Sequence, residues 1–380
     1  MFLLRDRLIV SASDLRLASE CEFATLRALD LTLGRVDKGV VEDDPMADRL
    51  GELGDLHEQA RLRELRAEHP GEGAVVELGR PDYSSVESLD AAMRHTLDAL
   101  SLDSGVEVLC QATLFDGSFV GHVDFLERTT QGWLVSDTKL ARHATVPALL
   151  QIGAYAAVLQ AAGVPLAPQA RLSLGSGADE DFPVAELVAV YAARRARLDA
   201  LLAAHRAQPF PARWDDDTVT ACGRCSVCEE EAQASLDLVL VAGMRMPTRR
   251  RLREAGVLTV SDLAARTEPV QEIRDRTLER LRRQAQLQVA FAANPQAGVI
   301  AEIIDGHELR RLPAPSNGDL FFDFEGDPLW AERGSSLWGL EYLFGMVEVD
   351  AGAPSYRAFW AHDRLDEKAA LIAFVEHVEA

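Results

Sequence analysis

Residues 118–140 read SFVGHVDFLERTTQGWLVSDTKL and contain two apolar, β-branched segments around a polar turn. Residues 118–127 and 133–140 are rich in β-forming residues and are separated by a short turn, so we expect two neighbouring strands. Asp124 falls in the first strand and Asp137 in the second. Adjacent strands can therefore bring the two carboxylates together.

Further elements are expected around these two strands. Residues 106–115 should form a third strand, because the Asp116-Gly117 turn that follows is a strong hairpin signal. Apolar residues at helical spacing, ended by Gly and Pro, predict the helices. The expected helices cover 11–30 (capped by Ser13), 46–68, 86–101, 146–162 and 184–205, and one more strand covers 169–174. Helices and strands that alternate in this way indicate an α/β unit.

The motif Asp137-Thr138-Lys139 carries chemistry. Asp137 and Lys139 lie two residues apart, so their side chains share one face of the expected strand. Charged side chains on an apolar sheet are costly unless they serve each other or a metal. With Asp124 they form a set of two carboxylates that suits Mg²⁺ or Mn²⁺. A lysine beside such an ion can orient and help deprotonate the attacking water, while the metal stabilises charge on a phosphate.

Two helices can add side chains to the same site. His57 lies on the expected helix 46–68, and its imidazole would favour Mn²⁺ somewhat over Mg²⁺. Gln151 and Tyr155 lie four residues apart on the helix after the lysine, so they share one face. Each residue alone has an ordinary explanation as part of a helix surface. The prediction rests on the order in which these motifs follow one another along the chain.

This order resembles a known family. LGELGDLHE (50–58), GHVD (121–124), DTK (137–139) and QIGAY (151–155) are similar to the motifs of the RecB-like branch of the PD-(D/E)xK nuclease superfamily, over about residues 10–235. The resemblance implies a restriction-endonuclease-like α/β core, with a mixed sheet flanked by helices. It implies that His57, Asp124 and Asp137 bind metal, that Lys139 is catalytic, and that Gln151 and Tyr155 lie near DNA. Asp137 stands where glutamate is commoner in this branch.

Five cysteines are unevenly distributed along the chain. Cys222, Cys225 and Cys228 fall within seven residues, and Cys21 is a natural fourth thiolate, whereas Cys110 is expected to be a small buried residue in a strand. Thiolate-only ligation suits Zn²⁺ or an iron–sulfur cluster, and the spacing leaves both open, together with unligated thiols. One early and three late cysteines resemble the [4Fe–4S] nucleases of the RecB-like group and of CRISPR adaptation, which favours iron–sulfur. Those relatives more often space the last pair further apart.

The region that follows is basic. Residues 236–295 hold 11 arginines against 7 acidic residues. Within it, residues 241–266 resemble a helix–hairpin–helix element, in which the turn at Gly256 can offer backbone N–H groups to a phosphate. A solvated arginine-rich helical linker is the alternative.

The C-terminal stretch FFDFEGDP (321–328) follows the Pro-rich linker LPAPSNG (312–318). Asp323 and Glu325 share one face of an expected strand, and they resemble the first D-x-E motif of ribonuclease-H-like DEDD exonucleases, which binds two metals. An acidic pair without metal is the alternative. We expect a partial domain here, because the sequence stops at Ala380 soon after the motif.

Composition limits the class of protein. The net charge of −22 weighs against a nucleic-acid partner, but a local basic surface can still bind phosphates. The chain has no apolar run of membrane-spanning length, and its start is unlike a signal peptide, so a cytoplasmic protein with no membrane partner is expected. We expect three domains: a nuclease domain (1–235), a helical region (236–311) and a partial ribonuclease-H-like domain (312–380).

The function expected from these features is that of a metal-dependent DNA nuclease that cuts single strands or DNA ends in DNA repair or processing. A helicase partner would act in trans, because the chain has no phosphate-binding loop of an ATPase. Two alternatives remain: a non-catalytic nucleic-acid-binding module on the same fold, and a zinc-stabilised protein that recruits a helicase.

Overall fold

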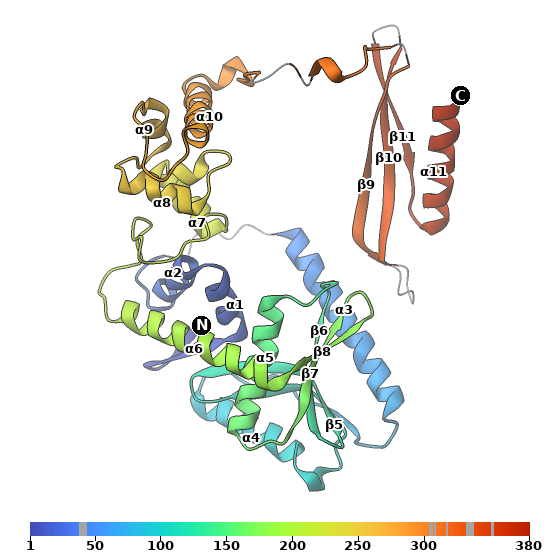
Figure 1. Ribbon diagram of the computed structural model, residues 1–380. Coiled ribbons are helices and arrows are strands. Elements are labelled where there is room, and N and C mark those ends of the chain that lie inside the picture. Colours follow the sequence, from blue (N-terminus) through green and yellow to red (C-terminus); the bar gives the residue numbers. More distant parts are fainter. Residues whose placement is uncertain (38–43, 304–306, 308, 317, 332–337, 351–352) are drawn as a thin grey trace. The chain divides into compact units, whose positions relative to one another are not determined.

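The computed structural model describes residues 1–37, 44–303, 307, 309–316, 318–331, 338–350 and 353–380. These residues form two compact units, Met1–Ile300 and Ala301–Ala380 (Figure 1). Among the described helices, none has the length and apolar character needed to cross a membrane.

The first unit contains a mixed eight-stranded sheet. Its order is β1-β2-β5-β6-β7-β8, while β4 pairs with the other edge of β5 and β3 pairs with β4. The strands predicted at 106–115, 118–127, 133–140 and 169–174 correspond to β4 to β7. The shorter strands were not predicted, since three to five residues show too little alternation. The bounds are β1 (Phe2–Leu4), β2 (Arg7–Ser11), β3 (Val75–Glu77), β4 (Val108–Phe115), β5 (Phe119–Thr129), β6 (Gly132–Lys139), β7 (Leu166–Leu174) and β8 (Asp179–Pro183).

One edge of β5 changes its partner along its length. It pairs with β2 at Phe119 and Val120, and with β6 only from Phe125 onward. Since β4 occupies the opposite edge throughout, residues 121–124 have no described strand partner on the first edge. The strand therefore has an open stretch that ends at Asp124.

Helices α3 (Pro45–Glu68) and α5 (Val146–Ala161) cover opposite faces of this sheet (Figure 1). Leu65 of α3 packs with Phe125 of β5, whereas Leu126 belongs to the core that α5 covers. Neighbouring residues of a strand point to opposite faces, so the two helices lie on the two sides. The other helices of this part are α1 (Ala12–Glu20), α2 (Glu22–Thr32), α4 (Val86–Ala99), η1 (Leu102–Ser104), α6 (Val184–Arg206) and α7 (Ser226–Ser235).

The single helix predicted at 11–30 is wrong, because α1 and α2 are separate. The chain is extended at Cys21, with φ −156°, and the Cys21 thiol accepts a hydrogen bond of 3.4 Å from Ala24 N–H at the start of α2. Ser11, not Ser13, caps α1, and its N–H and hydroxyl both donate to the Asp14 carboxylate. The apolar spacing continues through both helices, so the pattern could not show the break.

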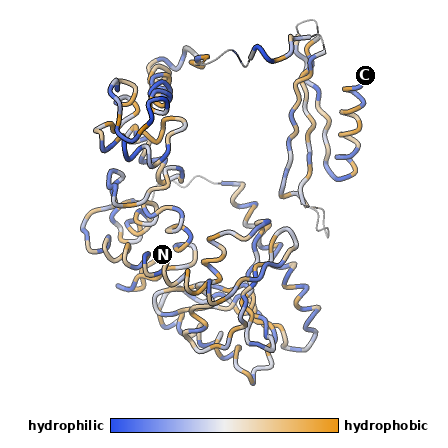
Figure 2. Tube along the Cα trace, in the orientation of Figure 1, coloured by the Kyte–Doolittle hydropathy of each residue, from blue (hydrophilic) through white to orange (hydrophobic). Residues whose placement is uncertain are grey.

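The helical region has a hydrophobic core of its own. Helices α8 (Met246–Glu254) and α9 (Val260–Ala265) are joined by a turn in which Gly256 has φ +76°. The buried residues include Leu238, Leu252, Leu263 and Leu281, so a solvated linker is excluded. The remaining elements are η2 (Leu238–Leu240), α10 (Asp275–Ala293) and η3 (Pro295–Ala297), and Figure 2 shows how strongly hydrophilic much of α10 is.

A buried ion pair anchors this region to the segment before the late cysteines. Arg249, 4% exposed, donates two hydrogen bonds of 2.7 and 2.6 Å to Asp237, which is 1% exposed. The indole N–H of Trp214 donates to the same carboxylate at 2.9 Å, and the Arg249 guanidinium lies over the Trp214 ring. One arginine of the predicted phosphate-binding element is therefore occupied inside the protein.

The second unit is a three-stranded antiparallel sheet with one helix. Phe374 of the helix packs with Phe344 and Met346 of the central strand. The elements are η4 (Leu309–Arg311), β9 (Leu320–Ala331), β10 (Trp338–Asp350), β11 (Ala353–Trp360) and α11 (Arg364–Glu379).

Replacement of Arg249 by alanine should destabilise the first unit. The change leaves the Asp237 carboxylate buried without its cation, which costs about 3–5 kcal/mol. Arg251→Ala is the matched control on the same helix, since Arg251 pairs with the exposed Glu272 and its loss should cost less than about 1 kcal/mol. Urea unfolding followed by circular dichroism measures both. Equal effects of the two substitutions would contradict this account of the anchor.

Candidate active site and cysteine centre

Asp124 lies at the end of the open stretch of β5. Its carboxylate oxygen Oδ2 accepts two hydrogen bonds of 2.8 Å, from the backbone N–H and the hydroxyl of Thr138 on β6. These bonds fasten Asp124 to the strand that carries the second acid. Asp124 lies near enough to Asp137 for its charge to raise the pKa of that second acid.

Asp137 is fully buried on β6. Its Oδ1 accepts a long hydrogen bond of 3.4 Å from Gln151, while Oδ2 is paired directly with the Lys139 ammonium. Burial, and next the charge of Asp124, raise the pKa of Asp137 to about 8. When both acids are ionised, Asp124 and Asp137 carry two negative charges against the single positive charge of Lys139.

Lys139 is distinctive among the basic residues of the chain. Of the 39 lysines and arginines, only Lys38, Lys139 and Lys368 are lysines. Burial lowers the pKa of Lys139, but Asp137 and Asp124 outweigh it and raise the pKa overall. A chain that uses arginine almost everywhere has a compact ammonium here, a group that can point at one water or phosphate oxygen. This compositional signal was available in the sequence.

Helix α5 closes the site from one side. Gln151 donates a hydrogen bond of 2.8 Å to the Tyr155 hydroxyl, and Tyr155 is 2% exposed. A side chain at Gly121 would meet the Tyr155 ring at 2.5 Å, so only glycine lets this ring approach the open stretch of β5. The structure thus brings Gln151 and Tyr155 to Asp137, and it explains the glycine of the GHVD motif.

His57 lies beside the same strand ends but is not gathered with the acids. Its Nε2 is 3.3 Å from the carbonyl oxygen of Ser173, which pairs with Thr138 across β6 and β7. Within the described residues, the four cysteines form the only group of three or more metal-ligating side chains whose ligand atoms lie within 4.8 Å of one another. His57 would have to leave the Ser173 carbonyl to join a metal held by Asp124 and Asp137.

The residues present fit a hard divalent ion. Two adjacent carboxylates, one of them fully buried and with a raised pKa, supply what Mg²⁺ needs from a protein when waters complete the shell. Asp124, Asp137 and, after a shift, His57 are the side chains that would hold it.

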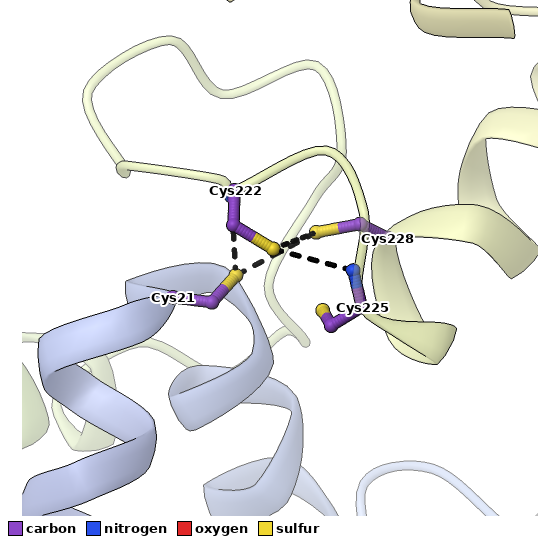
Figure 3. A group of neighbouring side chains, drawn as sticks. All are labelled: Cys21, Cys222, Cys225 and Cys228. Atoms are coloured by element: carbon purple, nitrogen blue, oxygen red, sulfur yellow. Dashed lines mark hydrogen bonds between the residues drawn. The ribbon is translucent and has the colours of Figure 1, made fainter. Parts of the chain in front are cut away.

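The four cysteines converge on one point (Figure 3). The sulfur of Cys228 is 3.5 Å from that of Cys21 and 3.8 Å from that of Cys222. Backbone N–H groups point at the sulfurs: those of Ala24 and Cys222 donate to Cys21, and that of Cys225 donates to Cys222. The hydrogen bond from Cys228, together with the weaker ones from the N–H groups of Ala24 and Cys222, lowers the pKa of Cys21 to about 5 against the opposing effect of burial.

The surroundings of this centre are apolar. Phe23 and Trp214 are in edge contact and enclose the sulfurs together with aliphatic side chains. Cys110 lies elsewhere, buried beside Leu65 and Phe125, as expected for a small core residue. The four sulfurs converge, which argues against the alternative of unligated thiols in one loop.

Asp323 and Glu325 lie in the second unit on β9, where both side chains are exposed. Their backbones pair with Gly345 and Leu343 of β10. No third acidic ligand joins them in the described part of the chain. The metal site proposed for this pair, and the ribonuclease-H-like assignment of 312–380, stay predictions.

A mixed sheet with helices on both faces, and with two acids and a lysine on adjacent strands, is typical of a class of nucleases. The model of the PD-(D/E)XK nuclease superfamily matches residues 10–229, more than half of the chain, and the chain belongs to this superfamily. Comparison with curated proteins gives no significant match.

Among solved structures, a Eubacterium rectale protein whose name suggests an exonuclease is similar over 58% of this chain and 87% of its own, with 11% sequence identity and a TM-score of 0.30. A likeness of this size supports no conclusion about function.

The metal-free protein should lose stability as pH rises. The pKa of Asp137 is about 8 in the folded chain against an ordinary 3.8, so the folded state keeps a proton that the unfolded state releases. The resulting stabilisation is complete below pH 3.8 and is lost as pH rises towards 8. Thermal unfolding without divalent ions, compared between parent and Asp137→Asn across this interval, measures it. The difference between the two melting temperatures should change with pH, and two parallel curves would refute the assignment.

Proposed function

We propose that this chain is a divalent-metal-dependent DNA nuclease of the RecB-like branch, which hydrolyses phosphodiester bonds of single strands or DNA ends. The observation that carries the proposal is the fully buried Asp137 carboxylate, held between Asp124 and Lys139. An uncompensated acid pair is expensive inside a sheet, and a divalent cation relieves that cost.

The side chains would divide the work as follows. The ion, when bound, stabilises negative charge on the scissile phosphate and acidifies a water. Asp124 and Asp137 hold it, and the bonds from Thr138 keep Asp124 in position. Lys139 is a charged donor in the metal-free site because its pKa is raised, so its Nζ orients a water or a phosphate oxygen. Gln151 and Tyr155 fix the wall of α5 and exclude bulk water.

The net charge of −22 does not favour a DNA substrate, but the basic helical region (236–295) does. The N–H groups of residues 255–260 at the α8–α9 turn already donate hydrogen bonds within the chain. A phosphate would therefore be met by an exposed arginine of this region, such as Arg250 on α8. A role in DNA repair or processing, with a helicase acting in trans, follows from the resemblance to the RecB-like branch. The non-catalytic module and the helicase-recruiting protein are the competing functions.

Asp124→Asn and Lys139→Ala should each reduce cleavage roughly a hundredfold or more while leaving DNA binding within a few-fold of the parent. Lys368→Ala is the matched control, because it removes another lysine from a helix of the second unit. The assay uses end-labelled single- and double-stranded DNA with Mg²⁺ and with Mn²⁺. A parent protein that binds DNA and never cuts it would support the non-catalytic module.

We also propose that the four cysteines hold a structural metal centre. The resemblance to other nucleases favours [4Fe–4S], with Zn²⁺ as the alternative. The sulfur separations support the alternative: around one tetrahedral ion with Zn–S bonds of about 2.3 Å, sulfurs lie about 3.8 Å apart. In a four-iron cluster each thiolate binds a different iron, which places the sulfurs further apart.

Anaerobic purification separates the two centres. On the resemblance, a brown protein with iron and inorganic sulfide is expected, whereas a colourless protein with one zinc per chain would establish the single ion. In either case Cys21→Ser should lose metal and unfold at a lower temperature, because Cys21 joins α1 and α2 to the late cysteines. Cys110→Ala is the control and should keep its metal. Full metal content in Cys21→Ser would remove Cys21 from the ligand set.

A further inference from the structure

Tyr83 lies in the segment 78–85, which connects β3 with α4, and it was not among the residues that the sequence motifs indicated. Its hydroxyl is hydrogen-bonded to Nε2 of His122 on β5. Its ring is in edge contact with the rings of His122 and of Phe2 on β1, with centroids 5.9 Å apart in each pair. The side chain is nevertheless 37% exposed. A large aromatic ring is therefore held in one place while part of its surface faces solvent.

The segment that carries Tyr83 is restrained on both sides of this residue. The backbone N–H of Leu78 donates a hydrogen bond of 3.0 Å to the Cys110 carbonyl of β4. On the other side, the Asp82 carboxylate accepts a hydrogen bond of 2.9 Å from the backbone N–H of Ser84 and another from its hydroxyl. A side chain that is fixed in advance loses little conformational entropy when it binds a ligand. Tyr83 is therefore preorganised for contact with a ligand.

His122 places Tyr83 beside the acid pair. It belongs to the open stretch of β5 and lies two residues before Asp124, and two residues of a strand span about 7 Å. Its Nδ1 is 3.2 Å from the hydroxyl oxygen of Thr113 on β4, so both nitrogens of the His122 ring are engaged. A nucleic-acid strand whose phosphate lies at Asp124 therefore brings a neighbouring base within reach of the Tyr83 ring.

Arg80 adds a positive charge to the same place. It is exposed, and among the described residues none forms a hydrogen bond or an ion pair with it. Burial raises the pKa of Tyr83 and lowers that of His122, and the charge of Arg80, which lowers both, is the next cause. The same charge acts on Glu58 of α3, whose pKa is raised by burial and then by the charge of Asp124. Arg80 therefore lies close both to Tyr83 and to the surroundings of the first acid.

We propose that Tyr83 and Arg80 bind the nucleotide next to the scissile phosphate and thereby select single-stranded DNA. The inference rests on the proposed nuclease function and names the contacts that choose its substrate. A base stacks on the Tyr83 ring, and Arg80 pairs with the adjoining phosphate. A base inside a duplex is stacked between its neighbours and reaches the ring only after its pair has opened, which costs free energy. An unpaired strand, or a frayed end, makes the contact without that cost.

DNA binding to the full chain tests this proposal without any need for cleavage. It is measured by fluorescence anisotropy without added divalent ions, on a labelled single-stranded oligonucleotide and on a blunt duplex of the same sequence. Tyr83→Ala should weaken single-strand binding roughly tenfold, because one stacked base is lost, and should leave duplex binding unchanged. Tyr83→Phe keeps the ring and should bind as the parent does.

Arg80→Ala should also weaken single-strand binding. Because one phosphate contact is lost, the slope of the logarithm of the binding constant against the logarithm of salt concentration should become shallower by about 0.7. Phe210→Ala and Arg94→Ala are the matched controls for the aromatic and the arginine, since both residues are exposed in the same unit. Both control variants should bind the two probes as the parent does.

Each outcome decides between the possible roles of Tyr83. Parental single-strand affinity in Tyr83→Ala overturns the inference, and it leaves the proposed function intact where the parent cuts DNA. An equal loss on single strand and duplex, with a lower melting temperature, also overturns it, because the ring would then only support the fold. A parent that binds single strands through Tyr83 but never cuts them contradicts the proposed nuclease and keeps the Tyr83 contact. If Tyr83→Ala does not fold, Tyr83→Leu replaces it, since leucine can pack on Phe2 but offers no flat ring to a base.

Discussion

Burial of the Asp137 carboxylate governs the arrangement of every side chain around it. A charge removed from water inside an apolar sheet must be neutralised, protonated or coordinated. Lys139 neutralises part of the negative charge, and the raised pKa shows that Asp137 tends to keep its proton. A bound divalent ion would neutralise the charge that remains. The bonds from Thr138 to Asp124 and from Gln151 to Tyr155 hold the groups that surround this acid in place.

The topology of β5 makes room for this arrangement. Because β2 and β6 share one edge of β5 and leave residues 121–124 between them, the sheet opens where the chemistry is placed. Gly121 lets Tyr155 enter that opening, and Gln111 of β4, on the other edge of β5, has φ +54°. Three local departures from regular structure therefore coincide at Asp124. Regular sheet continues on either side and gives the site rigid support.

The sequence predicted the long strands, most helices and the acid–lysine set, because these depend on alternation, helical spacing and distances of two residues within a strand. It missed the break at Cys21, since the apolar pattern runs through it. It placed His57 with the acids, but a helix position does not determine which strand-end group the ring will meet, and here that group is the Ser173 carbonyl. The left-handed backbone of Gln111 was missed as well, because no pattern of residue types reveals it.

The cysteine centre also has a consequence for the order of folding during synthesis. Cys21 meets Cys228, 207 residues further along, so one clasp encloses almost the whole superfamily core. Closing a loop of that length in an unfolded chain costs about 5 kcal/mol in chain entropy. A core that has already collapsed holds the two ends of this loop near each other and removes most of that cost, and the last thiol becomes available only after it has left the ribosome. A metal bound here would then seal a core whose strands and helices are already paired.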